Sequence, residues 1–233
     1  MKKIYILLSV LLFTLIIINL NKLDGLNKYF KQELFKINPD KSTILPIKSS
    51  EKFINDTIID SNNNLTQLIS KSKAPSFVVD SLILLNVNYF GFDNKIHKGQ
   101  VIVNKKCRNS IRTIFNELMN IRFPIYSVKP ISFFEWNDSL SMAQNNTSSF
   151  NYRTVDGTSK MSDHAYGLAI DINPLLNPYI KENYFSKPIN AVYDTTAPGT
   201  IHTNSEVVKI FKKHGWKWGG DFYYIKDYQH FYY

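Results

Sequence analysis

The sequence has 233 residues, which suits one domain with added segments, because most domains hold about 100–150 residues. Hydrophobic residues make up 44% of the chain, enough for a packed core. The 28 basic and 19 acidic residues give a formal net charge of +9, which favours anionic partners, but the lysines are scattered and we expect no nucleic acid partner. The single cysteine, Cys107, excludes an intrachain disulfide and a zinc site built from thiolates.

The N-terminus has the layout of a secretory signal or a signal-anchor. Lys2 and Lys3 precede an apolar run from Ile4 to Leu20. This run is at the short end for a membrane-spanning helix, which needs about 17–25 residues. Because no small-x-small cleavage pattern follows it, we expect an uncleaved anchor in the cytoplasmic membrane over residues 1–20, with the rest of the chain outside the cytoplasm. Cleavage, which would give a secreted protein, is the alternative.

Residues 21–74 are rich in Lys, Asn, Ser and Asp and show little sustained periodicity. This composition predicts a tether that carries one or two short helices at most. We expect the globular domain to occupy residues 75–233. A tether of this kind suits a protein that reaches from a membrane into surrounding polymer.

Two extended stretches and one amphipathic helix are predicted in the first half of the domain. The apolar stretches Leu82–Tyr89 and Val101–Val103 predict strands, and residues 91–99 between them have turn chemistry. Apolar residues from Ile111 to Met119 recur at i, i+3, i+4, i+7 and i+8, which predicts a helix packed on a sheet.

A second helix is predicted near the C-terminus. Thr203 and Glu206 have the spacing of a capping box, and Gly215 suits the end of the helix. Short strands mixed with a few helices indicate a compact α+β domain with a small antiparallel sheet and flanking helices.

Three residues near the C-terminal end suggest a metal site. In Leu168–Ile172, aliphatic residues alternate with Ala and Asp, which predicts a strand that turns Asp171 away from its aliphatic face. Gly167 would let the preceding loop turn sharply, so that His164 approaches Asp171. With His230, these residues supply two imidazoles and a carboxylate, the ligand set of a catalytic zinc that keeps a position for water. We therefore predict one Zn²⁺ ion held by His164, Asp171 and His230.

An acidic residue accompanies the last histidine. Asp227 lies three residues before His230, which brings both side chains to one side of a turn or short helical segment. A carboxylate near the metal that does not bind it is suited to act as a general base. Gly219 and Gly220 before this segment permit close backbone approach or positive φ. The combination predicts a zinc hydrolase.

These motifs resemble the zinc D-alanyl-D-alanine carboxypeptidase family of bacterial cell-wall enzymes (peptidase family M15), whose fold relatives include hedgehog signalling domains. The family pattern is S-x-H, six variable positions and D, followed later by an acidic residue, two variable positions and H. It matches Ser162, His164, Asp171, Asp227 and His230 at each position. A stretch ending in Arg153 is similar to the family's substrate loop. The resemblance implies a zinc domain with the hedgehog/DD-peptidase-like fold.

The resemblance also implies roles for residues around the metal. Asp227 would take a proton from water and pass it to the leaving amine, and Arg153 would stabilise the oxyanion. Ser162 would contact the substrate; a hydroxyl that caps the loop is the alternative reading. Asp221 is expected to orient a zinc histidine or to support its loop rather than to bind metal.

The expected function is a membrane-anchored zinc peptidase of the bacterial cell envelope. Its substrates would be peptidoglycan stem peptides, cut as by a D,D-carboxypeptidase or as by an endopeptidase of the L-Ala-D-Glu type. One alternative is a non-catalytic, zinc-containing module that binds the cell wall, although a pure binder needs neither Asp227 nor Arg153. A serine hydrolase built on Ser162 and His164 is disfavoured, because no glycine elbow surrounds Ser162.

Overall fold

The structure is a computed structural model that describes residues 57–181 and 185–233. The expected anchor at residues 1–20 and the tether over residues 21–56 lie outside the described residues. Within the two described ranges, no helix has both the length and the apolar character that crossing a bilayer requires.

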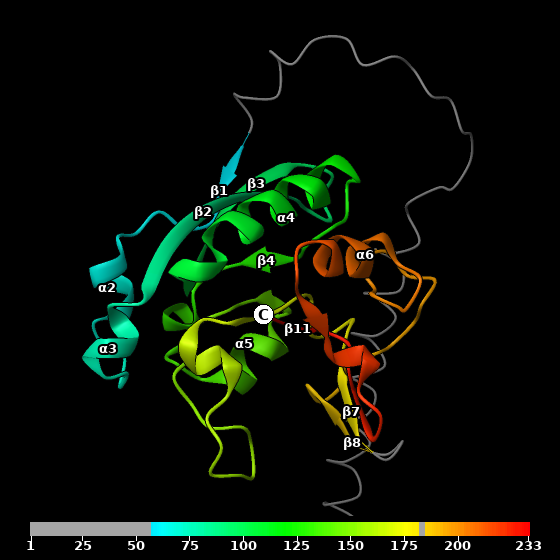
Figure 1. Cartoon of the computed structure of the whole chain (residues 1–233). Coiled ribbons are helices and arrows are strands. Elements are labelled where there is room, and N and C mark those ends of the chain that lie inside the picture. Colours follow the sequence, from blue (N-terminus) through cyan, green and yellow to red (C-terminus); the bar gives the residue numbers. More distant parts are fainter. Residues whose placement is uncertain (1–56, 182–184) are drawn as a thin grey trace, which may run out of the picture. The chain divides into compact units, whose positions relative to one another are not determined.

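Short strands and helices are mixed along the described chain (Figure 1), which confirms the α+β prediction. The strands are β1 (Ile58–Ile59), β2 (Leu82–Phe90), β3 (Ile96–Asn104), β4 (Ser127–Val128), β5 (Asn146–Thr147), β6 (Ala169–Asp171), β7 (Tyr179–Lys181), β8 (Phe185–Lys187), β9 (Lys217–Trp218), β10 (Ile225–Asp227) and β11 (His230–Tyr232). The α-helices are α2 (Leu65–Ile69), α3 (Ser76–Val79), α4 (Arg108–Asn120), α5 (Asp138–Ala143) and α6 (Glu206–Lys213). Single 3₁₀ turns are η2 (Lys105–Cys107), η3 (Ile131–Phe134), η4 (Asp163–Tyr166) and η5 (Gly219–Asp221).

The strands form small sheets, three of them three-stranded within the described ranges. Their orders are β1-β3-β2, β10-β7-β8 and β6-β11-β9, and β4 pairs with β5. The β2–β3 hairpin is the longest of these pairings, and α4 lies across it (Figure 1). The sheet that holds β6 and β11 is the one that positions the candidate site.

The predicted strands and helix of the first half are confirmed. Alternate residues of β2, namely Leu85, Val87 and Tyr89, are buried in the same core as the apolar side of α4. Four of the five predicted stripe positions in α4 are fully buried, and Met119 is partly buried at the margin. β3 begins already at Ile96, so the second strand is longer than its apolar centre indicates.

The second predicted helix exists, but it starts later than its capping pattern indicates. The cap of α6 is Ser205 rather than Thr203, and its side chain makes no capping hydrogen bond. The backbone N–H of Ser205 donates to the carbonyl of His202, so a turn occupies the positions expected for the first helical residues. The helix end is as predicted, because Gly215 has a φ of +83° that favours glycine.

Residues 57–74 pack on the domain, although the sequence predicts a tether there. β1 pairs in parallel with β3. Leu68 of α2 and Val78 of α3 are buried in a small apolar cluster with Leu82 at the start of β2. Elements this short contain too few periodic positions to be recognised within a Lys- and Asn-rich stretch.

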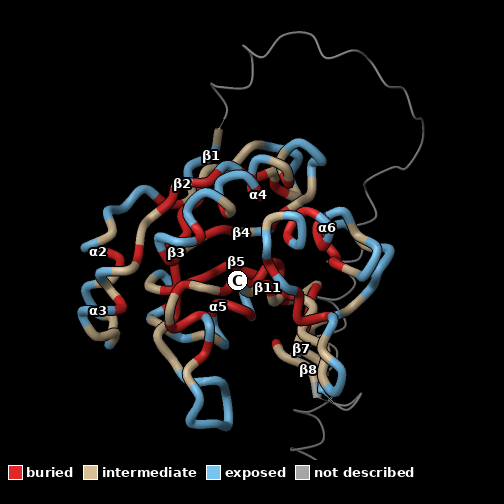
Figure 2. The backbone as a smooth tube through the Cα atoms, viewed as in Figure 1, coloured by how far each residue is buried: buried red, intermediate tan, exposed pale blue. Residues whose placement is uncertain are grey.

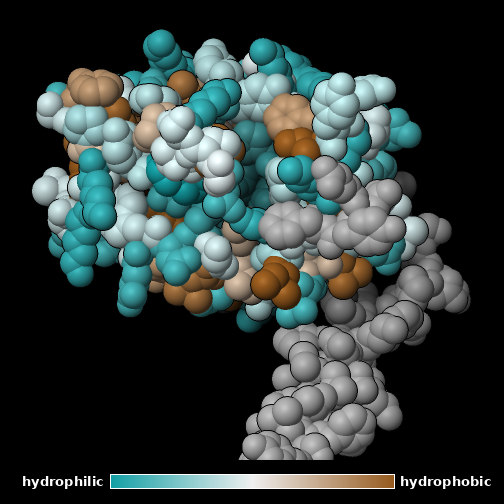
Figure 3. All heavy atoms as spheres, turned by 90° about the horizontal axis from the view of Figure 1, so that it is seen from below, coloured by the Kyte–Doolittle hydropathy of each residue, from teal (hydrophilic) through white to brown (hydrophobic). Residues whose placement is uncertain are grey.

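The main core joins α4, the β2–β3 hairpin, α6 and the β6-β11-β9 sheet. Figure 2 shows buried residues concentrated on the strands at the centre, with exposed residues on the outer loops. β6 is buried on both faces: Ile170 is inaccessible to solvent and Asp171 is only 6% exposed. The sequence pattern predicts one buried face for β6, so the structure differs at this point. The outer surface seen in Figure 3 is mostly hydrophilic, with apolar residues in separate patches.

Candidate metal centre

The pairing of β6 with β11 brings Asp171 and His230 together. In this antiparallel pair the two residues are direct partners across the strands. Cross-strand partners point to the same face with their Cβ atoms about 4.5–5.5 Å apart. On its other side, Asp171 exchanges two backbone hydrogen bonds with Ser148, at 2.9 and 3.2 Å. The backbone of Asp171 is therefore fixed from both sides.

His164 reaches the same point from η4, just before β6. Gly167 ends η4 with a φ of +64°, and a Cβ there would lie 2.7 Å from the backbone nitrogen of Asn104. Both the left-handed conformation and the close approach require glycine, as the sequence suggested. The ring of His164 is held by Ser149, whose carbonyl oxygen lies 2.6 Å from Nδ1. Since a carbonyl only accepts, Nδ1 carries the proton and Nε2 is free to bind a metal.

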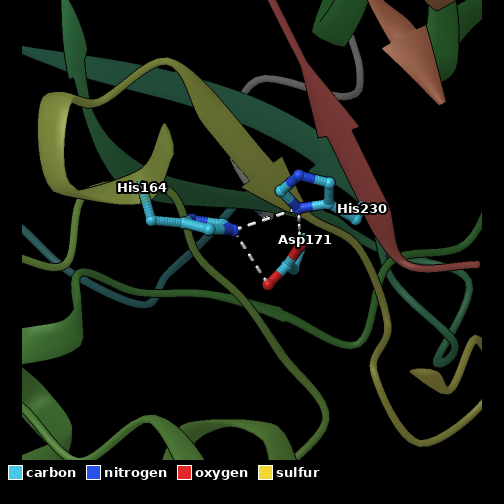
Figure 4. A group of neighbouring side chains, drawn as sticks. All are labelled: His164, Asp171 and His230. Atoms are coloured by element: carbon cyan, nitrogen blue, oxygen red, sulfur yellow. Dashed lines mark hydrogen bonds and ion pairs between the residues drawn. The ribbon is translucent and has the colours of Figure 1, made fainter. Parts of the chain in front are cut away.

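Three side-chain groups converge at the centre of Figure 4. Nε2 of His164 lies 3.2 Å from Nδ1 of His230 and 3.2 Å from Oδ2 of Asp171. Nδ1 of His230 lies 3.0 Å from Oδ1 of Asp171. Ligand atoms bound at about 2.0–2.2 Å to a tetrahedral Zn²⁺ lie about 3.3 Å from each other. The three groups therefore have the chemistry and the spacing that one such ion requires.

Asp171 and His230 shift each other's pKa values. Burial alone would raise the pKa of Asp171, but the charges and hydrogen bonds of His164 and His230 outweigh it and hold this pKa well below its usual range. Burial lowers the pKa of His230, but the hydrogen bond and charge of Asp171 prevail and raise it. The carboxylate of Asp171 thus stays ionised although it is buried. A carboxylate must be ionised to bind a metal ion.

Asp227 lies beside this cluster without joining it. A two-residue turn separates β10, which ends at Asp227, from β11, which begins at His230. Of the two arrangements that the spacing allowed, the structure shows the turn. Burial raises the pKa of Asp227 from its ordinary value of 3.8 to about 6, while the charge of His230 opposes the rise and that of Asp171 adds to it. Its Oδ1 atom is shielded from solvent and has no hydrogen-bond partner among the described residues.

Gly219 allows the turn between β10 and β11 to pack. A Cβ on Gly219 would lie 2.6 Å from the carbonyl oxygen of Asp227 and 3.2 Å from Cβ of His230. The glycine is needed here for close approach, because its φ is not in the left-handed region. The sequence allowed either close backbone approach or positive φ as the reason for Gly219 and Gly220.

Arg153 faces the same cavity as the cluster and is tied to His164 through the backbone. The N–H of Asn151 donates to the carbonyl of His164, at 3.0 Å, and the N–H of Ser162 donates to the carbonyl of Arg153, at 3.1 Å. The guanidinium forms an ion pair with Asp138, with Nη2 2.8 Å from Oδ2. The position of Arg153 relative to the cluster is therefore set by backbone pairing and by a carboxylate on α5.

Ser162 caps the loop that carries His164. Its hydroxyl accepts a hydrogen bond from the backbone N–H of His164, at 3.3 Å, and its side chain is buried at the start of η4. This contact corresponds to the loop-capping role, one of the two roles that the sequence allowed for Ser162. Ser162 also lines the cavity, so contact with a ligand remains compatible with its place.

Asp221 does not hold a histidine of the cluster. It is exposed, and its carboxylate pairs with Lys212 on α6 at 2.7 Å. Of the two roles predicted for Asp221, this ion pair, which links η5 to α6, corresponds to support of its loop rather than to orientation of a histidine. Asp221 lies close to the site in sequence, but η5 turns its side chain outward.

A cavity of about 700 Å³ contains these groups. This size is typical of a small-molecule or peptide site, which occupies about 300–1,000 Å³. Its lining includes the three clustered residues, Ser162, Arg153 and Asp227. It also includes Asp138 and Gln229, which sequence reasoning missed. Gln229 is only 3% exposed and lies in the turn between Asp227 and His230. Its place between these two predicted site residues is the feature of the sequence that could have identified it.

A protein-family model described as D-alanyl-D-alanine carboxypeptidase matches residues 156–233. This stretch contains the three clustered residues and Asp227, whereas Arg153 and Asp138 precede it. No curated protein and no solved structure matches the chain.

Proposed function

We propose that this chain, whose residues 156–233 belong to the D-alanyl-D-alanine carboxypeptidase family, is a zinc-dependent peptidase of bacterial peptidoglycan. The proposed substrates are stem peptides that contain D-amino acids, and the family description supports this class. The observation that carries the proposal is the convergence of His164, Asp171 and His230 beside the unpartnered carboxylate oxygen of Asp227. A structural metal site would have no need of that fourth, raised-pKa carboxyl group.

The proposed ligands of the ion are Nε2 of His164, Nδ1 of His230 and the carboxylate of Asp171. Zn²⁺, when bound, supplies a Lewis acid that polarises a carbonyl and lowers the pKa of water. The carboxylate of Asp227, which lines the cavity, accepts the proton of the attacking water and returns it to the leaving amine. In the metal-free protein the pKa of Asp227 is about 6, so the group can be both protonated and ionised at pH values near neutral.

Arg153 is proposed to stabilise the negative charge that develops on the substrate carbonyl. Its guanidinium lines the cavity and is fixed in place before any substrate binds. A preorganised positive charge of this kind costs no reorganisation when the oxyanion forms. Lys160 and Lys181 also line the cavity, and their positive charges suit a substrate with free carboxylates.

The test uses the full chain, purified peptidoglycan fragments and mass spectrometry of the products. A chelator is expected to abolish hydrolysis, and added Zn²⁺ to restore it. Asp227→Ala is expected to keep the metal, measured by elemental analysis, while kcat falls roughly 10²–10⁴-fold.

We also propose that residues 1–20 anchor the chain outside the cytoplasm, so the activity should appear in the envelope fraction and leave the membrane when these residues are deleted.

Asp194→Asn is the matched control, because Asp194 is exposed and its carboxylate hydrogen-bonds only to Thr196 among the described residues. Full activity in Asp227→Ala would remove Asp227 as the base, and activity that survives complete removal of metal would remove the zinc mechanism. Release of single D-alanine residues would indicate a carboxypeptidase, whereas new amino termini inside the stem would indicate an endopeptidase. Zinc-dependent wall binding without any product would favour the non-catalytic module.

A further inference from the structure

We propose that Asp138 is a positioning residue that aims Arg153 into the cavity; this inference rests on the proposed function. Asp138 is the first residue of α5, and both of its carboxylate oxygens are engaged. Oδ2 pairs with Nη2 of Arg153 at 2.8 Å, and Oδ1 accepts a hydrogen bond from Nδ2 of Asn151 at 3.3 Å. Asn151 is buried and fixed through its backbone to His164, so the carboxylate of Asp138 has a defined orientation.

The hydrogen bonds of Arg153 leave donors available for a ligand. A guanidinium has five N–H groups. One Nη2 hydrogen is used by Asp138, and one Nη1 hydrogen is donated to the carbonyl of Thr154 at 3.2 Å. Nε is shielded from solvent and has no partner among the described residues. The protein thus holds one N–H on each terminal nitrogen of Arg153, and the second N–H on each is left for a negatively charged group in the cavity.

Asp138 also keeps Arg153 away from competing carboxylates. The cavity lining includes Asp156, Asp163 and Asp227, any of which could attract a guanidinium. The charge of Arg153 already contributes to the lowered pKa of Asp156, after the stronger effect of Lys187. Without Asp138, the arginine would be free to turn toward these groups. An arginine paired with Asp227 would also neutralise the proposed base. The direction of Arg153 therefore affects both proton transfer by Asp227 and stabilisation of the oxyanion.

The experiment compares full-length variants Asp138→Asn, Asp138→Glu and Arg153→Ala, and the double variant Asp138→Asn with Arg153→Ala. Asp138→Asn is expected to lower kcat about 10–100-fold with KM nearly unchanged, because a misplaced oxyanion donor affects the transition state more than substrate binding. Asp138→Glu should recover part of the loss. In the Arg153→Ala background, Asp138→Asn should have no further effect. Glu206→Gln is the control, since it removes an exposed carboxylate ion pair with Lys209.

A second measurement tests position without using activity. The ¹⁵N heteronuclear NOE of the Arg153 Nε–H group is expected to show a rigid side chain in the unchanged protein and a mobile one in Asp138→Asn. Retained rigidity, or a loss of kcat that is equally large in the Arg153→Ala background, would overturn the inference. If the unchanged protein hydrolyses no wall peptide, the proposed function fails, while the NOE still decides whether Asp138 orients Arg153.

Discussion

At the scale of single residues, Asp227 places reactivity and stability in opposition. Its folded-state pKa of about 6 lies above the ordinary 3.8, so keeping it ionised inside the protein costs free energy at neutral pH. The cost is zero below the ordinary pKa, where the group is protonated in both states. It grows between the two values and is complete above the higher one.

We therefore expect Asp227→Asn to stabilise the metal-free protein while it abolishes hydrolysis. The gain in unfolding free energy should be on the order of 3 kcal/mol at pH 8 and should vanish near pH 4, because the pKa is raised from 3.8 to about 6 and one pKa unit corresponds to about 1.4 kcal/mol. Urea unfolding with a chelator present, at several pH values, measures this difference. A gain that is independent of pH would show that the effect does not come from the charge, and Asp194→Asn supplies the exposed comparison.

At the scale of elements, the site depends on how β10, β11 and η5 pack. A methyl group on Gly219 would meet the backbone of Asp227, which cannot move as a flexible side chain would. Gly219→Ala is expected to cost about 1–3 kcal/mol of stability through overpacking and to lower activity, because Asp227 and His230 both shift. Thermal unfolding and peptide hydrolysis, measured together, test both effects.

Gly215→Ala is the comparison for this substitution. Gly215 has a positive φ but open space around it, since a Cβ added there would lie 3.8 Å from its nearest neighbour, Cε2 of Tyr233. This variant should lose stability through backbone strain and keep its activity. Equal loss of activity in both variants would mean that global destabilisation, rather than displacement of the site, explains the effect of Gly219→Ala.

The elements that could be predicted from the sequence are those with a local pattern. α4 is predictable because its apolar stripe repeats over several turns, and Gly167 because a sharp turn is needed before Asp171. The partner of Arg153 could not be predicted, because the direction of Asp138 depends on how α5 is placed in three dimensions. The sequence also left two roles open for Asp221, because its nearness to the site along the chain does not show which side chain it pairs with in space.

At the scale of the whole molecule, the position of the domain boundary has a measurable consequence. Because β1 and α2 pack on the domain, a chain that begins at residue 57 should be more stable than one that begins at residue 75. Burial of Leu68 alone contributes about 1.5–3 kcal/mol. Chemical unfolding of the two shortened chains tests this. Equal denaturant midpoints would show that residues 57–74 do not stabilise the domain and belong to the tether.

The direct pairing of His230 with Asp171 makes ion capture sensitive to strand alignment. If β11 slipped by a single position along β6, the imidazole would turn to the opposite side of the sheet. Such a molecule would keep most of its secondary structure and would still be unable to retain zinc. Under the proposed function, a molar ratio of bound zinc to protein below one is therefore the expected sign of a preparation in which some molecules have misaligned strands.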